Sequence, residues 1–164
     1  MRIMKIFVLF LAVLAFGFAY AQGGEVTAGT GQKLNMSEKI FDPTRDTAKD
    51  ISDAITLATK QNKHILLDVG GNWCSWCHKL DTLFKTDAEV GKLLKKYVVV
   101  KVNFSPDNEN KAVLANYPKI ETGYPHIFVL DKSGKLIQDQ DTGKLESGDH
   151  HDPAKVIEFL KKWS

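Results

Sequence analysis

Apolar residues recur along this chain with the spacing of helices in some segments and of buried strands in others. One helical face is visible over about residues 47–61, where the apolar positions follow the i, i+3, i+4, i+7 rule: Ile51, Ala54, Ile55 and Ala58. Short apolar runs with several β-branched side chains predict three buried strands, at residues 65–69, 98–102 and 126–130. The chain therefore alternates helices with strands.

Two helices are expected between the first two strands. The first begins near Cys74, where the sulfur of this residue can be exposed, and its core-facing positions are Cys77, Leu80 and Phe84. Thr86 and Glu89 have the spacing of a capping box that opens the second helix. The apolar stripe of that second helix consists of Val90, Leu93, Leu94 and Tyr97.

The last third of the chain predicts a hairpin and a closing helix. A short helix is expected over residues 108–116, and residues 131–134 have the composition of a turn, so residues 135–138 should pair with the third strand. Asp152 and Pro153 suit the N-cap and first position of a last helix, whose stripe is Val156, Phe159, Leu160 and Trp163. This order predicts an α/β domain with a mixed central sheet and helices on both faces.

The first residues have the composition of a cleaved export signal. Arg2 and Lys5 precede an uncharged apolar run, and Ala19 and Ala21 stand at the −3 and −1 positions of a cleavage site. An uncleaved membrane anchor is disfavoured because the run is shorter than the roughly 20 residues that span a bilayer. We expect a periplasmic or secreted protein. Its expected organisation is a signal peptide over residues 1–21, a flexible tether rich in Gly and Thr over residues 22–39, and one domain over residues 40–164.

Charge excludes some classes of partner. Loss of the signal would remove Arg2 and Lys5, which lowers the 22 Lys and Arg residues to 20, equal to the 20 Asp and Glu residues. A mature chain without net charge does not attract nucleic acid or an anionic membrane by electrostatics. We expect a monomer that binds no nucleic acid.

The only cysteines, Cys74 and Cys77, lie two residues apart. In an oxidising compartment most cysteine pairs are structural braces, but a pair this close, after an apolar run and before a helical pattern, predicts a redox centre. At a helix N-terminus the backbone N–H groups favour a thiolate, so Cys74 is the expected nucleophile. Cys77 is the expected resolving thiol, which attacks the bond between Cys74 and a substrate.

Three features in the expected order make the chain resemble the thioredoxin superfamily from about residue 46 to residue 163. Asp68 lies six residues before Cys74, Trp73 directly precedes that cysteine, and Tyr124-Pro125 stands before the third strand. The motif is similar to that of exported thioredoxin-like reductases, W-C-x-W-C-H. The resemblance implies a thioredoxin fold and a thiol:disulfide oxidoreductase that reduces protein disulfides without a cofactor. Its partners would be exported disulfide-containing proteins and an unidentified electron donor, for which a membrane thiol–disulfide relay is one candidate.

Asp68 is expected to be a buried carboxyl beneath the cysteines, without a salt partner, that accepts the proton of Cys77. The alternative is a carboxylate at the strand end that accepts backbone hydrogen bonds. The resemblance also implies a cis peptide bond before Pro125, so that the Tyr124 backbone faces Cys74 and pairs with an extended substrate.

Trp73 and Trp76 offer flat apolar surface to a substrate, although Trp73 could equally pack in the core. His78 either tunes the thiols or is solvated, and His150 and His151 are expected to be loop residues. Where thioredoxin has Gly-Pro between its cysteines this chain has Ser75-Trp76, so the reduction potential of thioredoxin does not transfer.

Other functions are compatible with parts of the motif. Cys74, Cys77 and His78 also have the spacing of a c-type haem attachment site, but Met36, the one methionine of the mature chain, lies in the tether. A thioredoxin-fold copper-binding chaperone would use both cysteines and a histidine, although cysteines in such proteins are normally three residues apart. A structural or chaperone role would not need both cysteines. We expect no metal site.

Overall fold

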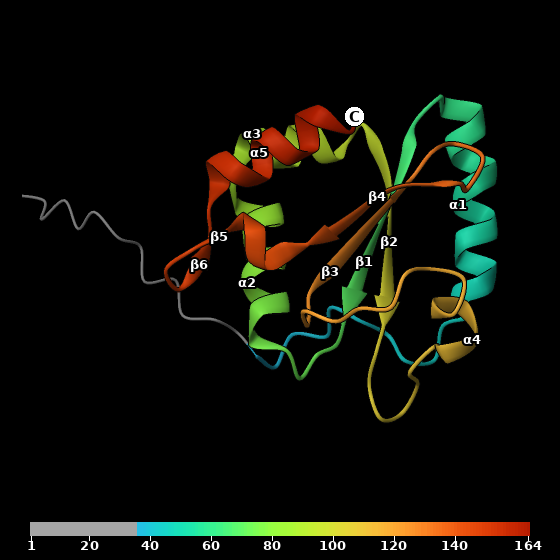
Figure 1. Ribbon diagram of the computed structural model, residues 1–164, viewed down its shortest axis with the longest axis horizontal. Coiled ribbons are helices and arrows are strands. Elements are labelled where there is room, and N and C mark those ends of the chain that lie inside the picture. The colour runs from blue at the N-terminus through green and yellow to red at the C-terminus, as the bar shows by residue number, and fades with distance from the viewer. Residues whose placement is uncertain (1–35) are drawn as a thin grey trace, which may run out of the picture. The chain divides into compact units, whose positions relative to one another are not determined.

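A four-stranded mixed sheet with helices on both faces organises residues 36–164, the part of the chain that the computed structural model describes (Figure 1). The expected signal peptide and residues 22–35 of the expected tether lie outside the described residues. The elements are α1 (Thr47–Gln61), β1 (His64–Gly70), α2 (Ser75–Thr86), α3 (Ala88–Leu94), β2 (Tyr97–Asn103), α4 (Lys111–Leu114), β3 (His126–Leu130), β4 (Leu136–Asp141), the 3-10 helix η1 (Thr142–Leu145), β5 (Glu146–Ser147), β6 (His150–His151) and α5 (Pro153–Lys162).

The strand order in the sheet is β2-β1-β3-β4. β1 pairs in parallel with β2, while β3 runs antiparallel to both β1 and β4. A parallel pair requires a crossover, and α2 and α3 supply it between β1 and β2. The predicted mixed sheet with helices on both faces is confirmed.

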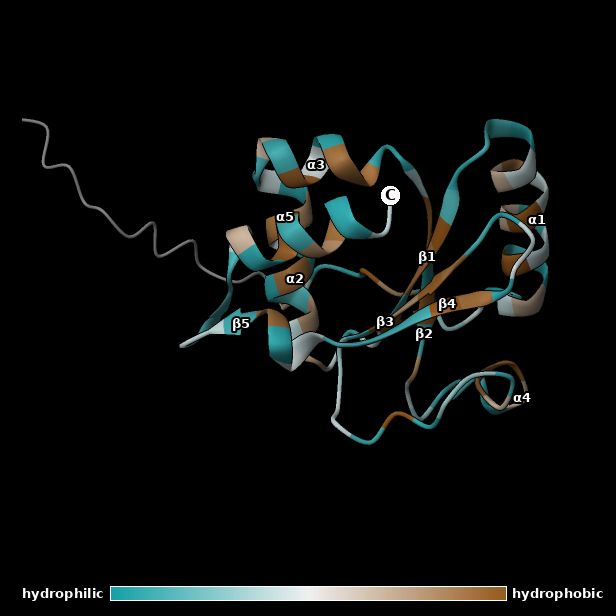
Figure 2. Cartoon of the chain, turned by 45° about the horizontal axis from the view of Figure 1, so that its top comes forward, coloured by the Kyte–Doolittle hydropathy of each residue, from teal (hydrophilic) through white to brown (hydrophobic). Residues whose placement is uncertain are grey.

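Each face of the sheet is covered by its own set of helices. Leu66 packs with residues of α2, α3 and α5, whereas its neighbours Ile65 and Leu67 pack with residues of α1. This alternation follows from the two-residue period of a strand. Figure 1 shows α1 and α4 on one side of the sheet and the other helices opposite, and in Figure 2 the central strands carry the hydrophobic colour. The core therefore lies on both faces of β1 and β3.

Several predicted boundaries agree closely with the structure. α1 spans the predicted residues 47–61, and β3 spans the predicted residues 126–130. Asp152 caps α5 by accepting hydrogen bonds from two backbone N–H groups, and Pro153 is the first helical residue. These elements carry strong local signals, which explains why their limits were predictable.

Three local predictions are wrong. Tyr97, expected in the apolar stripe of the second helix, is the first residue of β2. Asp87, not Thr86, caps α3, because the Asp87 carboxylate accepts from the backbone N–H groups of Glu89 and Val90 while the Thr86 hydroxyl donates to Thr82 within α2. The expected helix over residues 108–116 is reduced to α4, Lys111–Leu114. Asn110 has a φ of 49°, a left-handed conformation that cannot continue a right-handed helix.

The described part of the N-terminal segment runs back along α2. The Glu38 carboxylate pairs with the Lys85 ammonium over 2.5 Å, and both side chains are about half exposed. Phe41 is buried, in agreement with the expectation that ordered structure begins near residue 40. Among the described residues, no helix has the length and apolar character needed to cross a membrane.

Candidate active site

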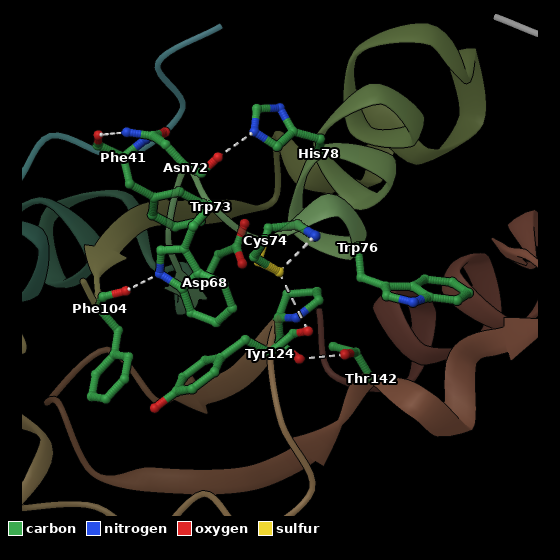
Figure 3. Close-up of a disulfide and its surroundings, with 12 residues drawn as sticks. Phe41, Asp68, Asn72, Trp73, Cys74, Trp76, His78, Phe104, Tyr124 and Thr142 are labelled. Carbon is green, nitrogen blue, oxygen red and sulfur yellow. Dashed lines mark hydrogen bonds between the residues drawn. A yellow bond between two sulfur atoms is a disulfide. The ribbon is translucent and has the colours of Figure 1, made fainter. Parts of the chain in front are cut away.

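The two cysteines form a disulfide at the first turn of α2 (Figure 3). Cys74 is the N-cap residue, and the backbone N–H of Cys77 donates a hydrogen bond to Cys74 Sγ over 3.1 Å. The sulfur occupies the position of a capping oxygen, where unpaired helix N–H groups would stabilise a thiolate after reduction. The predicted places of Cys74 at the helix start and of Cys77 on the core side are confirmed.

The disulfide is buried. Cys74 is 4% exposed and Cys77 is 2% exposed. Phe41, Trp76 and Tyr124 pack against the pair. The expectation of an exposed Cys74 sulfur is therefore wrong for the disulfide form, because aromatic side chains from three different segments cover the start of α2.

Gly70, the last residue of β1, leaves the space that the disulfide fills. A Cβ at this position would lie 2.6 Å from Cys77 Sγ and 3.0 Å from Phe41 Cζ. Real Cβ atoms do not approach heavy atoms to 2.6 Å, so any larger residue here must displace the sulfur. Glycine at the strand end is thus required by close approach.

Asn72 fastens the N-terminal segment to the loop before the cysteines. Its side-chain oxygen accepts hydrogen bonds from the backbone N–H groups of Ile40 and Phe41, at 2.8 and 3.0 Å. Its side-chain nitrogen donates to the Phe41 carbonyl over 2.7 Å. His78 is 3% exposed, and its Nε2 lies 3.0 Å from the Asn72 carbonyl oxygen, so Nε2 carries the proton that is donated. His78 is therefore a buried support of the loop and is not solvated.

Tyr124 presents its backbone to Cys74. The Tyr124 carbonyl oxygen lies 3.4 Å from Cys74 Sγ, and the Tyr124–Pro125 peptide bond is cis, as the resemblance implied. The Thr142 hydroxyl donates to the Pro125 carbonyl oxygen and joins this loop to η1 (Figure 3). The loop is therefore held beside Cys74 from two directions.

Trp73 forms an exposed aromatic surface next to the disulfide. It is 54% exposed, which rules out the alternative that it packs in the core. Its Nε1–H donates to the Phe104 carbonyl over 2.8 Å, and its ring meets the Tyr124 ring edge to face, with centroids 5.9 Å apart. Phe104 stacks on Tyr124 with centroids 4.7 Å apart. Three aromatic side chains thus form one surface beside Cys74.

Trp76 lies on the other side of the cysteines, away from Trp73 (Figure 3). The Lys79 ammonium lies 4.2 Å from the centroid of its ring. His151, 3% exposed, meets the Trp76 ring edge to face, with centroids 5.3 Å apart. The expectation that His150 and His151 are loop residues is wrong, because both belong to β6 and His151 is buried against α2.

Asp68 is buried on β1, and it has a cationic partner. Its Oδ2 lies 2.7 Å from Lys101 Nζ, and Lys101 also reaches Asp81 Oδ1 of α2 at 2.8 Å. The expectation that Asp68 lacks a salt partner is therefore wrong. Its second oxygen, Oδ1, is buried without a hydrogen-bond partner among the described residues, so one side of the carboxylate is free to bind a proton.

The ion pairs of Lys101 shift the pKa values of Asp81 and of Lys101 itself toward the charged forms. Burial by itself would raise the pKa of Asp81, but the Lys101 and Lys85 ammonium groups outweigh it and hold the pKa below the ordinary value. Burial by itself would lower the pKa of Lys101, and the two carboxylates outweigh it and raise this pKa. Asp81 and Lys101 are thereby both held in their charged forms at neutral pH.

Sequence reasoning missed several residues of the site, among them Lys101, Asn72, His151 and Phe41. Lys101 is a charged residue inside an otherwise apolar strand, and this sequence signal could have suggested a buried partner of opposite charge. Asn72 and His151 carried no local signal, because their partners lie more than 30 residues away. Phe41 was expected to be ordered, but its position over the cysteines could not be inferred.

Within the described residues, no group of three or more His, Cys, Asp or Glu side chains is arranged to hold a metal ion.

A groove of about 490 Å³ opens next to the aromatic surface. Its lining includes Phe104 and Tyr124 at one end and, further from the cysteines, Leu114, Tyr117 and Ile120.

Known proteins share this sequence pattern. A family model described as thioredoxin-like matches residues 46–132, just over half of the chain. The thiol:disulfide interchange protein DsbD of Actinobacillus pleuropneumoniae is 32% identical over 92 residues, which cover 56% of this chain and 16% of the relative. DsbD of Colwellia psychrerythraea is 26% identical over 161 residues, 96% of this chain and 25% of the relative. The chain thus spans a quarter or less of the length of these curated relatives.

Solved structures share the fold. A disulphide isomerase from Xylella fastidiosa Temecula1 superposes with a TM-score of 0.67 at 24% identity, covering 76% of this chain and 96% of that one. The oxidised C-terminal domain of Neisseria meningitidis DsbD gives a TM-score of 0.51 at 21% identity, covering 73% and 97%. With the sheet order, the paired cysteines and the matching family model, these likenesses establish that the chain has the thioredoxin fold and belongs to the thioredoxin-like family.

Proposed function

We propose that this protein is an exported thiol:disulfide oxidoreductase that reduces protein disulfides through the Cys74–Cys77 couple. The observation that carries the proposal is the hydrogen bond from the Cys77 backbone N–H to Cys74 Sγ at the start of α2. It gives the first sulfur a stabilising donor as soon as it becomes a thiolate. The second sulfur stays within disulfide distance of the first.

The reaction is two successive thiol–disulfide exchanges. The Cys74 thiolate attacks one sulfur of the substrate disulfide, and the other substrate sulfur leaves as a thiolate. The Cys77 thiolate then attacks Cys74 Sγ, the bond between Cys74 and the substrate breaks, and the second substrate sulfur leaves. Two electrons pass to the substrate and the enzyme ends as the disulfide.

Asp68 is suited to take the proton that Cys77 must lose before it attacks. Its Oδ2 is held by Lys101, which fixes the carboxylate, while Oδ1 has no partner among the described residues. Asp68 is buried beneath the disulfide, where proton transfer to bulk water is hindered (Figure 3). Oδ1 is therefore placed to accept a proton while Oδ2 is held by Lys101.

The substrate would bind across Tyr124 and the aromatic surface. An extended peptide beside the Tyr124 backbone can pair with it strand to strand and bring a disulfide to Cys74. Trp73 and Tyr124 would contact the residues that flank the disulfide. The apolar groove that begins at Phe104 and Tyr124 would accept a side chain further along the peptide.

The dithiol must be regenerated by a second protein. The relatives named as thiol:disulfide interchange proteins align with this chain over only 16% and 25% of their own length. We infer that a membrane thiol–disulfide relay supplies the electrons, and that the protein acts as a monomer in the periplasm or outside the cell. Residues 1–21 would direct it there.

Two measurements test the proposal. The protein should accelerate the reduction of insulin by dithiothreitol, and Cys74→Ser should return the rate to background. A redox titration of the Cys74–Cys77 couple tests the direction, and a potential near the roughly −270 mV of thioredoxin would support a reductase. A potential near the roughly −120 mV of a strong oxidant would reverse the proposed direction.

A further inference from the structure

The hairpin formed by β5 and β6 rests against the first turns of α2. Glu146 pairs with His151 and Ser147 with His150, and Gly148 in the turn has a φ of 61°. The Lys79 ammonium of α2 donates to the Asp149 carbonyl in that turn. The hairpin is thus tied to the helix that carries the cysteines.

His151 is the residue of this hairpin that reaches the redox motif. Its Nε2 lies 3.3 Å from the carbonyl oxygen of Trp76, the residue directly before Cys77. A carbonyl can only accept, so Nε2 carries the proton of the neutral ring. The other nitrogen, Nδ1, is buried without a hydrogen-bond partner among the described residues. The neutral ring therefore suits this site in one tautomer.

Protonation of Nδ1 would create a buried N–H without an acceptor. We propose that neutral His151 is a positioning residue, which holds Trp76 beside the cysteines through the carbonyl hydrogen bond and the edge-to-face ring contact, and that protonation releases it. Trp76 and Tyr124 both pack against the disulfide, so a released Trp76 changes the surface that a protein substrate meets. The inference concerns substrate binding and rests in that respect on the proposed function.

The charges around His151 set the pH at which Trp76 is released. Burial lowers the pKa of His151 below its ordinary value, and the ammonium of Lys79 on α2 and the neighbouring His150 on β6 act in the same direction. The Trp76 carbonyl and the Asp68 carboxylate on β1 act in the opposite direction, and Glu146 lies across the hairpin on β5. Since the folded pKa is depressed, the neutral contact is complete above the ordinary value of 6.5 and is lost as the pH falls through the folded pKa.

The first test uses kinetics and a conservative variant. The KM for a protein disulfide should rise as the pH is lowered from about 7.5 toward 5, with little change for a small disulfide reagent. His151→Gln retains an N–H donor and does not titrate, so its KM should vary much less with pH. His151→Ala should raise the KM at neutral pH about fivefold, the equivalent of one ordinary hydrogen bond.

His150→Gln is the matched control, because His150 is the exposed neighbour with a side chain 60% exposed. It should keep the pH profile of the unmodified protein. If His151→Gln kept that profile as well, the proposal would be overturned. Should His151→Ala fail to fold, the comparison of the two Gln variants still decides.

The second test does not depend on catalysis. The indole N–H resonance of Trp76 in an NMR titration should shift with the ionisation of His151, and the shift should be absent in His151→Gln. The Trp73 indole serves as the internal reference, since its N–H is bonded to Phe104. A Trp76 resonance that does not titrate would overturn the inference even if the protein reduces disulfides. A titrating resonance in a protein without reductase activity would support the inference and leave the proposed function refuted.

Discussion

Lys101 Nζ lies 2.7 Å from Asp68 Oδ2, and the two residues are direct register partners on the parallel strands β2 and β1. Equivalent positions on neighbouring parallel strands point to the same face of the sheet. That face also carries α2, whose Asp81 accepts the second hydrogen bond of Lys101. The carboxylate beneath the disulfide is thus one end of a cluster that joins two strands and a helix.

Asp68→Asn should slow turnover and also destabilise the fold. The amide cannot accept the Cys77 proton, and loss of a general base reduces a rate by roughly 100-fold or more. Lys101 would lose one of its two charged partners, which should cost about 1.5–3 kcal/mol. Insulin reduction across pH 6–9 and urea unfolding measure the two effects. Unchanged kinetics would reduce Asp68 to a structural residue.

Asp81→Asn should alter the response of stability to acid. The pKa of Asp81 is lowered in the folded protein, so its contribution is present above the ordinary value of 3.8 and is lost as the pH falls through the folded pKa. The variant should be less stable at neutral pH and should lose less stability on acidification. Unfolding measured between about pH 7 and pH 2 would show the smaller slope.

Asp53→Asn is the control for that experiment. Asp53 pairs with Lys49 on the surface of α1, and both side chains are more than 60% exposed. Exposed pairs of this kind contribute little to stability, because water and salt screen them. A loss of stability in Asp53→Asn as large as that in Asp81→Asn would contradict the importance assigned to burial.

Cys77→Ser should trap substrates. Cys74 can still attack a disulfide, but the variant has no second thiol to release the product, so mixed disulfides through Cys74 should accumulate. Non-reducing gels and mass spectrometry of extracts of exported proteins would detect them. The order of attack would be refuted by equal accumulation with Cys74→Ser.

Gly70→Ala should disturb the redox centre more than the addition of a single methyl group would suggest. The added methyl would meet Cys77 Sγ at 2.6 Å and Phe41 Cζ at 3.0 Å, so the sulfur must move and the Phe41 ring must give way slightly. Overpacking of this kind costs about 1–3 kcal/mol, and insulin reduction should fall with it. Thermal unfolding of the oxidised protein measures the loss of stability, and insulin reduction measures the loss of activity.

Gly91→Ala provides the matched control. Gly91 lies in α3, where an added Cβ would meet its nearest neighbour, the Phe84 carbonyl oxygen, at an ordinary 3.6 Å. Alanine in a helix interior is favoured over glycine by about 0.5–1 kcal/mol. Gly91→Ala should therefore be at least as stable as the unmodified protein. Equal losses in both variants would show that close approach to the sulfur is not the cause.

Local patterns were sufficient to predict much of the site. The helical start at Cys74, the inward position of Cys77 and the buried place of Asp68 all followed from spacing along the chain. The cap of α3 shows the limit of such patterns, because Thr86 and Asp87 are both capping residues and only the end of α2 decides between them. Where two neighbouring residues compete for one role, the preceding element settles the choice.

The sequence by itself determined most helix and strand limits and the place of the cysteine pair at a helix start, since these depend on contacts between residues close together in the chain. The resemblance to the thioredoxin superfamily supplied the fold class. Tertiary structure alone decided which side chains surround the disulfide. Lys101 reaches Asp68 through the register of two strands, Asn72 binds Phe41 across 31 residues, and His151 reaches Trp76 across 75. Such pairs depend on how whole elements pack, and the energy of packing is shared among many residues, so no local pattern encodes them.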